Sequence, residues 1–490
     1  MNDMTKSRRI WLLVGILIIA TFLRFYHLTT TPPGLYPDEA MNGNNAAEVI
    51  RTGDYKVYYP ENNGREGLFI AIQAGILKVV DLHEPWVLRL PSAVAGVLTV
   101  LGLYLLAAEL FGAGTGLLAA FLLATSFWHI NFSRIGFRAI LAPLLLAWAA
   151  YLLIKAYKTP LRRTGAWYAV IAGIVYSLGL YTYIAYRITP LLFLLFIPFY
   201  KKYPDFWKRT LLFIVAIVVV AAPIGWYFLK NPADFFGRTA QISVASTANP
   251  VVAFSANAAK TLLMFNIHGD DNWRHNYSGA PELFWPVGIL FVLGIALGIR
   301  DLWTHRGRWK KSPQAFAWLF IFLWFILAML PAAASDEGLP HALRSILMLP
   351  AAIVLAAAAG IWCYEKMKGK SAAAAKTVAV IFIIAVGIYG YVEYFVLWAR
   401  NPNVQGAFAA NYVEIGREIN ALPVTTPKYV VVLAGGVMAR GLPVPAETVL
   451  YITNTFLPDE QAAKNVHYLL PGEENKIPPG TPSSTIFYIR

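Results

Sequence analysis

Long apolar runs separated by short polar segments make up most of this chain. A bilayer core about 30 Å thick is crossed by roughly 20 apolar helical residues. Runs that reach or approach this length occupy residues 10–28, 86–108, 115–132, 139–157, 166–184, 186–200, 209–229, 283–299, 314–333, 342–364 and 377–398. These eleven runs predict an all-α polytopic membrane protein with about 11 transmembrane helices.

One further apolar run, Leu68–Val80, is short for a span, and its placement decides the side of every later loop. If this run crossed the membrane, four basic clusters would lie on the side opposite the N-terminal Lys6, Arg8 and Arg9. The clusters are Lys155/Lys158/Arg162/Arg163, Lys201/Lys202/Lys208/Arg209, Arg300/Arg306/Arg308/Lys310/Lys311 and Lys366/Lys368/Lys370/Lys376. Because cytoplasmic loops carry the excess of Lys and Arg, we predict that the run lies as an interfacial helix and does not span.

This assignment gives the topology of a multi-pass protein of the plasma (inner) membrane. The N-terminus is expected to be cytoplasmic, and the run after Arg9 is expected to remain as an anchor. Residues 1–399 form the transmembrane domain, in which 29–85 is a first external loop with interfacial helices and 230–282 is a long external loop. The outer face therefore holds nearly all the polar loops that could carry chemistry.

The remaining residues, 400–490, are less apolar and are expected to form a small soluble extracytoplasmic α/β domain. An amphipathic pattern predicts a helix at about Gln405–Leu422. Strand-like runs follow at Tyr429–Ala434, Thr448–Ile452 and Thr485–Ile489.

Composition agrees with a membrane protein and excludes several classes. Hydrophobic residues make up 58% of the chain and charged residues 14%, and the 15 Trp and 26 Tyr suit headgroup-level positions. A single cysteine, Cys363, excludes an internal disulfide and a cysteine metal cluster. The net charge of +14 comes from short clusters between apolar runs, so topology explains it better than nucleic-acid binding does.

The first external loop contains the leading catalytic candidate, Asp38. It follows Pro37 and precedes a predicted helix from Glu39 to Thr52, which Gly53 closes. An Asp at the N-cap accepts backbone N–H bonds and stays ionised in the field of the helix dipole, and capping alone is an equally good explanation. At the membrane surface, however, such a carboxylate can orient and partly deprotonate an acceptor, a role that Glu39 could share.

Arginines lie near the outer ends of several predicted spans. In the first two outer regions these are Arg65, followed by Glu66, and then Arg89, Arg134 and Arg138. A single arginine at a span end often only extends its side chain to the headgroups. Several that converge on one loop suit a phosphate or pyrophosphate, which guanidinium groups bind through two hydrogen bonds.

Two later loops combine acids with Arg and His. The first contains Asp270, Asp271, Arg274 and His275, and the second contains Glu337, His341 and Arg344. Each could be a solvated loop, a cation site or an anion site. Two adjacent aspartates supply too few oxygens for a hard cation, so a divalent metal has little support and no cofactor is expected.

Together these segments resemble the GT-C polytopic glycosyltransferases, in particular the family 39 protein O-mannosyltransferases and their relatives that transfer aminoarabinose to lipid A. The resemblance covers about residues 10–400. It rests on Asp38-Glu39, Asn63-Gly64-Arg65-Glu66-Gly67-Leu68, Arg89-Leu90-Pro91-Ser92-Ala93, Ser133-Arg134 after Gly116-Leu117-Leu118-Ala119-Ala120, the run Asp270–Asn276, and Pro340-His341-Ala342-Leu343-Arg344.

The resemblance implies a polyprenyl-phosphate-linked sugar donor, an extracytoplasmic acceptor and one inverting displacement at the anomeric carbon. Asp38 would be the base or acceptor-orienting group, with Glu39 beside it. The implied donor-phosphate ligands are Arg65, Arg89, Arg134, Arg138, Arg274, His275, His341 and Arg344. The remaining candidates, for acceptor or sugar, are Glu66, Asp270, Asp271 and Glu337. Residues 133–138 contain no acid, unlike the second external loop of metal-dependent oligosaccharyltransferases.

The alternative from another class is a transporter or flippase of lipid-linked sugars. Transporters place ionisable residues near mid-membrane, often in paired repeats. Here the acids collect in predicted external loops, which favours an enzyme.

Overall fold

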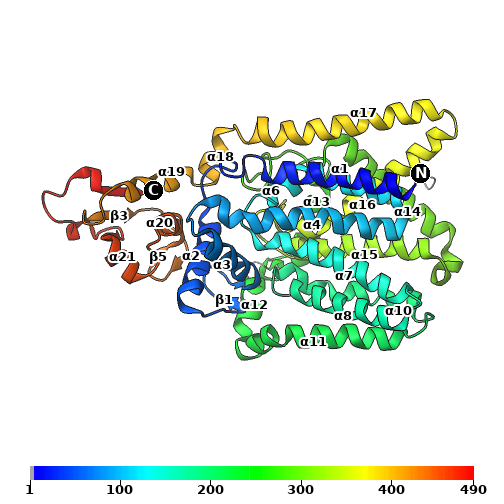
Figure 1. Ribbon diagram of the computed structural model, residues 1–490, viewed down its shortest axis with the longest axis horizontal. Coiled ribbons are helices and arrows are strands. Elements are labelled where there is room, and N and C mark those ends of the chain that lie inside the picture. Colours follow the sequence, from blue (N-terminus) through cyan, green and yellow to red (C-terminus); the bar gives the residue numbers. More distant parts are fainter. Residues whose placement is uncertain (1–4, 242) are drawn as a thin grey trace. The chain divides into compact units, whose positions relative to one another are not determined.

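The computed structural model describes residues 5–241 and 243–490, which divide into two compact units (Figure 1). The first unit comprises Met1–Tyr26, Ser92–Ser133 and Arg138–Trp398. The second comprises His27–Pro91, Arg134–Phe137 and Ala399–Arg490. Residues 29–85, predicted as the first external loop, belong to the second unit.

The first unit is a bundle of helices. Its elements are α1 (Lys6–Phe25), the greater part of α4 (Pro85–Phe111), α5 (Ala113–Thr125), α6 (Phe127–Phe132), η1 (Arg138–Ile140), α7 (Leu141–Lys158), α8 (Arg162–Gly179), η2 (Ile184–Ile188), α9 (Pro190–Phe193), α10 (Phe196–Tyr200), α11 (Phe206–Lys230), α12 (Pro232–Gln241), η3 (Val244–Ser246), α13 (Pro250–Leu263), α14 (Trp285–Thr304), η4 (Arg306–Lys311), α15 (Pro313–Ala333), η5 (Ile346–Met348), α16 (Leu349–Lys368), α17 (Ala372–Tyr391) and the π-helical η6 (Val392–Trp398).

Within the described residues, seven helical segments are long and apolar enough to cross a membrane. They are Pro85–Phe111, Arg138–Lys158, Phe206–Lys230, Trp285–Thr304, Pro313–Ala333, Ile346–Lys368 and Ala372–Trp398. The prediction of a multi-pass helical membrane protein is therefore confirmed, and the number of 11 spans stays a prediction. Leu68–Val80 forms one short apolar helix, so its predicted helical character is also confirmed.

Small residues allow close helix contacts in the first unit. Gly294 of α14 faces the backbone of Leu355 in α16, and a Cβ at this glycine would lie 2.2 Å from that carbonyl oxygen. Gly173 of α8 faces the backbone of Phe213 in α11 in the same way. Lipid provides no hydrophobic driving force between helices, so close packing of this kind carries much of their association.

The apolar run at residues 115–132 breaks into α5 and α6 at Ser126. The last carbonyls of α5 have no partner within the helix, and the buried Arg24 of α1 supplies donors to two of them. Its Nη1 lies 3.0 Å from the carbonyl oxygen of Ala124, and its Nη2 lies 3.4 Å from that of Leu123. Arg24 also contacts Nδ1 of His129 at 2.6 Å, which joins α1 to both halves of the broken run.

The second unit combines the loop after the first helix with the C-terminal segment. Its elements are α2 (Pro37–Thr52), β1 (Tyr58–Tyr59), β2 (Arg65–Glu66), α3 (Leu68–Val80), the first turns of α4, α18 (Pro402–Ala407), α19 (Ala410–Ala421), β3 (Lys428–Val432), β4 (Met438–Ala439), β5 (Leu442–Pro443), η7 (Val444–Ala446), α20 (Glu447–Thr453), α21 (Pro458–Lys464), β6 (Val466–Leu469), η8 (Glu474–Lys476), η9 (Ser483–Thr485) and β7 (Ile486–Ile489).

Its main sheet is parallel, in the order β6-β3-β7. Val430 of β3 pairs with Tyr468 of β6 and with Phe487 of β7. Two antiparallel pairs, β1 with β2 and β4 with β5, lie outside it.

Three details of the C-terminal prediction differ from the structure. The run Thr448–Ile452, predicted as a strand, lies within helix α20, whose residues are all buried. A short apolar run buried on all sides carries no period that separates strand from helix. The strand at Val466–Leu469 was missed, and the predicted helix at 405–422 is divided between α18 and α19.

Helix α2 and helix α20 share one core. Gly43 of α2 faces the ring of the buried Tyr451, and Nδ2 of Asn44 donates to Oε2 of the buried Glu447 at 2.7 Å. The hydroxyl of Thr448 donates to the carbonyl oxygen of Leu35 at 2.9 Å. The C-terminal segment thus packs against the first loop, and both belong to the second unit.

Ion pairs between the same two segments surround this core. Arg440 contacts Glu48 at 2.8 Å and Glu61 at 2.9 Å, and Arg417 contacts Glu84 at 2.8 Å. Pairs exposed in this way each add at most about 1 kcal/mol, so the apolar core and its buried hydrogen bonds provide most of the stability.

We expect Gly43→Ala to destabilise the second unit by about 1–3 kcal/mol, because an added methyl would overpack the site. Its Cβ would lie 2.7 Å from the Tyr451 ring, which is fully buried. The matched control is Gly75→Ala in α3, where nothing lies within 4 Å. Because Ala favours a helix over Gly by about 1 kcal/mol, the control should not lose stability. Thermal unfolding in detergent measures both, and equal midpoints for the two variants would contradict the packing.

The buried Glu447 predicts a pH dependence of stability. Burial raises its pKa to about 7, although the hydrogen bond from Asn44 lowers it. The unfolded carboxyl titrates near 4.5, so the stabilisation from the neutral carboxyl is complete below that pH and is lost as pH rises through 7. A difference of about 2.5 in pKa corresponds to about 3 kcal/mol.

Glu447→Gln keeps an oxygen that can accept from Asn44 and removes the titration. Unfolding of both proteins between pH 5 and 8 should therefore show the variant gaining about 3 kcal/mol relative to the wild type as pH rises. A stability difference that does not change with pH would show that Glu447 does not titrate in this range.

Candidate functional site

The residues predicted to form one site belong to two units. The second unit holds Asp38, Glu39, Arg65, Glu66, Arg89 and Arg134, and the first holds Arg138, Asp270, Asp271, Arg274, His275, Glu337, His341 and Arg344. Each group has its own geometry.

Asp38 lies in the first turn of α2 and is half-buried. The helix begins at Pro37, two residues earlier than expected, because the fixed φ of proline suits the first helical position. Asp38 is therefore not the N-cap, and Tyr36 takes that position. Nδ2 of Asn62 donates to Oδ1 of Asp38 at 2.5 Å, which orients the carboxylate near the positive end of the helix.

Glu39, next to it, is completely buried. Its Oε2 lies 3.0 Å from Nε of Arg89 and accepts from the backbone amide of Gly136 at 2.6 Å. Arg89 also donates to the carbonyl oxygens of Pro32 and Gly34 at 2.7 and 2.8 Å. The catalytic and phosphate-binding roles predicted for Glu39 and Arg89 would require this buried pair to separate.

The other predicted residues of the second unit are also buried. Arg65 donates to Oδ1 of Asn42 at 2.8 Å and to Oδ1 of Asn45 at 2.7 Å. Glu66 lies beside Arg65 in β2, and Arg134 donates to the carbonyl oxygen of Thr31 at 2.8 Å. These contacts order the polypeptide around α2.

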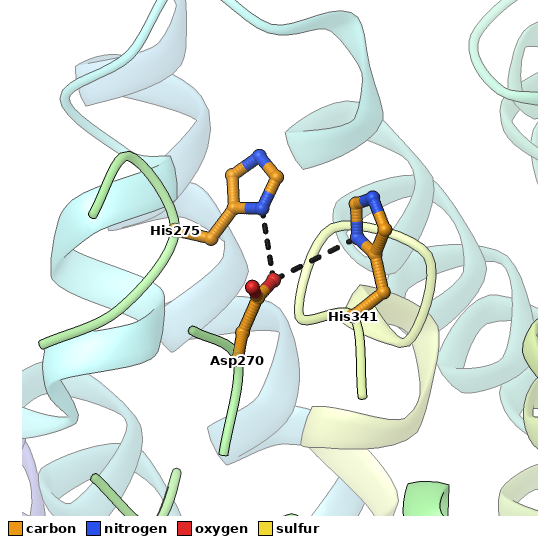
Figure 2. A group of neighbouring side chains, drawn as sticks. All are labelled: Asp270, His275 and His341. Atoms are coloured by element: carbon orange, nitrogen blue, oxygen red, sulfur yellow. Dashed lines mark hydrogen bonds and ion pairs between the residues drawn. The ribbon is translucent and has the colours of Figure 1, made fainter. Parts of the chain in front are cut away.

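In the first unit, three polar side chains meet between two loops (Figure 2). Asp270 and His275 come from the loop between α13 and α14, and His341 comes from the loop after α15. Oδ2 of Asp270 lies 2.9 Å from Nδ1 of His275 and 3.8 Å from Nδ1 of His341. The backbone amide of Ala342 donates to the same oxygen at 2.8 Å, and that of Asn272 donates to Oδ1 at 2.8 Å.

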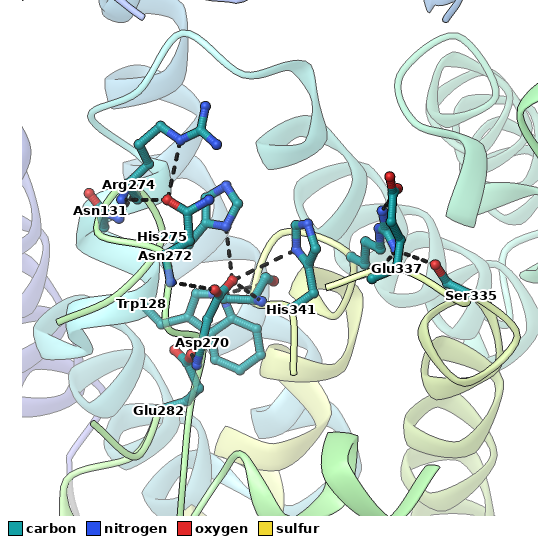
Figure 3. A network of polar contacts seen from close by, with 12 residues as sticks. Trp128, Asn131, Asp270, Asn272, Arg274, His275, Glu282, Ser335, Glu337 and His341 are labelled. Carbon is teal, nitrogen blue, oxygen red and sulfur yellow. Dashed lines mark hydrogen bonds and ion pairs between the residues drawn. The ribbon is translucent and has the colours of Figure 1, made fainter. Parts of the chain in front are cut away.

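A wider network holds both loops against α6 (Figure 3). Nδ2 of Asn131 donates to the carbonyl oxygen of Arg274 at 2.7 Å. The indole N–H of Trp128 donates to the carbonyl oxygen of Ala342 at 3.2 Å. Both α6 residues are buried, so this short helix fixes the position of the two loops.

Other predicted residues of these loops point elsewhere. Asp271 is exposed and pairs with His268 at 3.1 Å, so its side chain does not join the contacts of the adjacent Asp270. Arg344 donates to the Ser335 hydroxyl and to Oε2 of Glu337, the latter at 3.0 Å. Glu337 is itself exposed.

The surroundings shift several pKa values in these loops. Burial disfavours ionisation of Asp270, but the hydrogen bond and charge of His275 outweigh it and lower the pKa of the carboxyl. Burial, followed by the charge of His275, lowers the pKa of His341 to about 3. Burial lowers the pKa of Arg274 to about 10, so its guanidinium is still charged at neutral pH.

Sequence reasoning missed Glu282, which accepts from the backbone amide of Asp270 at 3.1 Å. It is buried, and burial raises its pKa well above the usual value. Its signal in the sequence was its position just before the predicted span at 283–299.

One part of the chain matches a known protein family. Residues 68–226 match the family described as dolichyl-phosphate-mannose-protein mannosyltransferase. No curated protein matches the chain.

Solved structures with the same fold come from bacteria and archaea. ArnT from Cupriavidus metallidurans bound to undecaprenyl phosphate is 15% identical, with a TM-score of 0.59 over 99% of this chain and 90% of that one. The apo oligosaccharyltransferase of Archaeoglobus fulgidus is 14% identical, with a TM-score of 0.56 over 92% of this chain. The match spans 64% of that longer enzyme.

The chain therefore has the fold of the GT-C polytopic glycosyltransferases, and its residues 68–226 match the protein O-mannosyltransferase family, which confirms the resemblance found in its sequence.

Proposed function

We propose that the protein is an inverting glycosyltransferase that moves a sugar from a polyprenyl-phosphate lipid to an acceptor on the extracytoplasmic face of the membrane. The observation that carries this proposal is the likeness to ArnT, which covers nearly the whole chain and whose structure holds undecaprenyl phosphate. The family match over residues 68–226 points to the same class of lipid-linked donor.

We assign the acceptor-orienting carboxylate to Asp38. Of the two adjacent acids, Glu39 is fully buried against Arg89, whereas Asp38 is half-buried and held by Asn62. The dipole of α2 favours its ionised form. In the transfer, Asp38 would take up the proton of an acceptor hydroxyl or amine while that atom bonds to the anomeric carbon. The bond between that carbon and the phosphate oxygen breaks, and the polyprenyl phosphate leaves with the electron pair.

We assign Arg274 to the donor phosphate. Its Nε donates to Oδ1 of Asn272 at 3.2 Å, and its carbonyl oxygen is held by Asn131, so its position is well defined (Figure 3). A guanidinium so oriented can neutralise the charge that develops on a leaving phosphate. Arg89 and Arg344 are weaker candidates, because each is paired with a glutamate.

Asp38→Asn should lower sugar transfer by about 100-fold or more, since a positioned acid or base contributes about 10²–10⁴-fold. The purified protein in lipid vesicles is supplied with the glycosylated polyprenyl phosphate that copurifies with it, identified by mass spectrometry. Release of free polyprenyl phosphate is then measured in the presence of extracted acceptor.

The matched control is Asp81→Asn, an exposed acid of the same unit in the left-handed C-cap of α3, a conformation that Asn tolerates. It should turn over like the wild type. Wild-type turnover in Asp38→Asn would exclude Asp38 as the catalytic carboxylate.

The proposed orientation predicts which engineered cysteines a thiol reagent can label from outside the cell. On a Cys363→Ala background, a cysteine at the exposed Leu82 should react with a membrane-impermeant thiol reagent added outside intact cells. A cysteine at the exposed Lys201 should react only after the cells are opened. The reverse pattern would place the first loop in the cytoplasm and overturn the charge argument.

A further inference from the structure

Asp270, His275 and His341 bring together three side chains of the kinds that bind transition metals (Figure 2). One ligand atom from each lies within 4.8 Å of the others. We propose that these three residues bind one divalent ion of the zinc type, which would join the loop between α13 and α14 to the loop after α15. This site does not depend on the proposed transferase activity.

The distances are close to those of a tetrahedral site. Zinc bonds to imidazole nitrogen and carboxylate oxygen are about 2.0–2.2 Å long, which places neighbouring ligands about 3.4 Å apart. Oδ2 of Asp270 lies 2.9 Å from Nδ1 of His275 and 3.8 Å from Nδ1 of His341. These two distances lie on either side of that value, and the two imidazoles lie within 4.8 Å of each other, so side-chain rotations can bring all three ligands to one ion.

The hydrogen bonding of His341 supplies a second, independent observation. Among the described residues, its Nδ1 is a buried atom without a hydrogen-bond partner. A buried polar group left unsatisfied costs about 1–3 kcal/mol. A metal ion at this point would satisfy the nitrogen, which faces the Asp270 carboxylate at 3.8 Å (Figure 2).

The carboxylate is also held in the way that metal ligands are held. The backbone amide of Asn272 donates to Oδ1 of Asp270, and that of Ala342 donates to Oδ2, the oxygen that faces both imidazoles (Figure 3). Hydrogen bonds of this kind orient ligands and tune their affinity. The adjacent Asp271 takes no part, because it is exposed and pairs with His268.

The ligand types select the ion. Ca²⁺ takes six to eight oxygen ligands and Mg²⁺ keeps several waters, whereas two imidazoles and one carboxylate suit Zn²⁺ and its neighbours. Three protein ligands leave one position of a tetrahedral ion open. An oxygen of water or of an anionic ligand could occupy it.

The test uses the tag-free, full-length protein in lipid nanodiscs, stripped with a chelator and dialysed. Titration with Zn²⁺, read by equilibrium dialysis and elemental analysis, should give one ion per chain. His341→Gln should weaken binding at least about 100-fold, since loss of even an outer-shell partner costs about 10–100-fold. His275→Gln should behave in the same way.

The matched control is His268→Gln, which removes an exposed histidine of the same loop that also contacts an aspartate. It should bind Zn²⁺ like the wild type. Thermal unfolding with chelator present checks that the variants are folded, and added Zn²⁺ should raise the midpoint of the wild type and of His268→Gln only.

Two results would overturn the proposal. One is a wild-type protein that binds no Zn²⁺ and gives Co²⁺ only the weak visible absorption of the hydrated ion, a measurement that needs no variant. The other is wild-type affinity in both His275→Gln and His341→Gln. Either would leave the cluster as a hydrogen-bonded junction between two loops.

Discussion

The second unit depends on one buried ion pair. Glu39 and Arg89 are both almost completely inaccessible, and removing one partner of such a pair costs about 3–5 kcal/mol because the other charge stays buried. Glu39 also accepts from the amide of Gly136, and Arg89 also donates to the carbonyl oxygens of Pro32 and Gly34. Three other stretches of chain, at residues 32–34, Arg89 and Gly136, are thus held around the first turn of α2, which leaves Asp38 as the carboxylate on its accessible side.

A carboxylate also organises the polar loops of the first unit, by a different arrangement. Asp270 accepts from two backbone amides and from His275, so one side chain holds its own loop and the next one together. These partners, His275 above all, lower the pKa of Asp270 despite its burial. The carboxyl therefore stays ionised and accepts the hydrogen bonds of the surrounding donors. The same carboxylate is therefore the structural centre of these two loops, and the proposed cation site is built on it.

The shared core of α2 and α20 changes the meaning of the C-terminal segment. Asn44 donates a hydrogen bond to Glu447, and Gly43 lies against Tyr451. The core around α2 is thus completed by α20, a helix that follows about 400 residues later in the sequence. A segment packed in this way supports the position of α2, and with it Asp38. The C-terminal region is thus part of the scaffold of the candidate site.

The sequence by itself determined the membrane class, the helical runs, the GT-C resemblance and the polar loops that hold the candidate residues. These follow from apolar length, loop charge and short motifs, all of which are local properties of the chain. Only the tertiary structure decided that Glu39 is buried against Arg89, that Asp270 and Asp271 separate, and that the tail packs on the first loop. Such outcomes depend on partners far away in the sequence, because burial and hydrogen bonding, rather than residue type, decide which charged groups remain accessible.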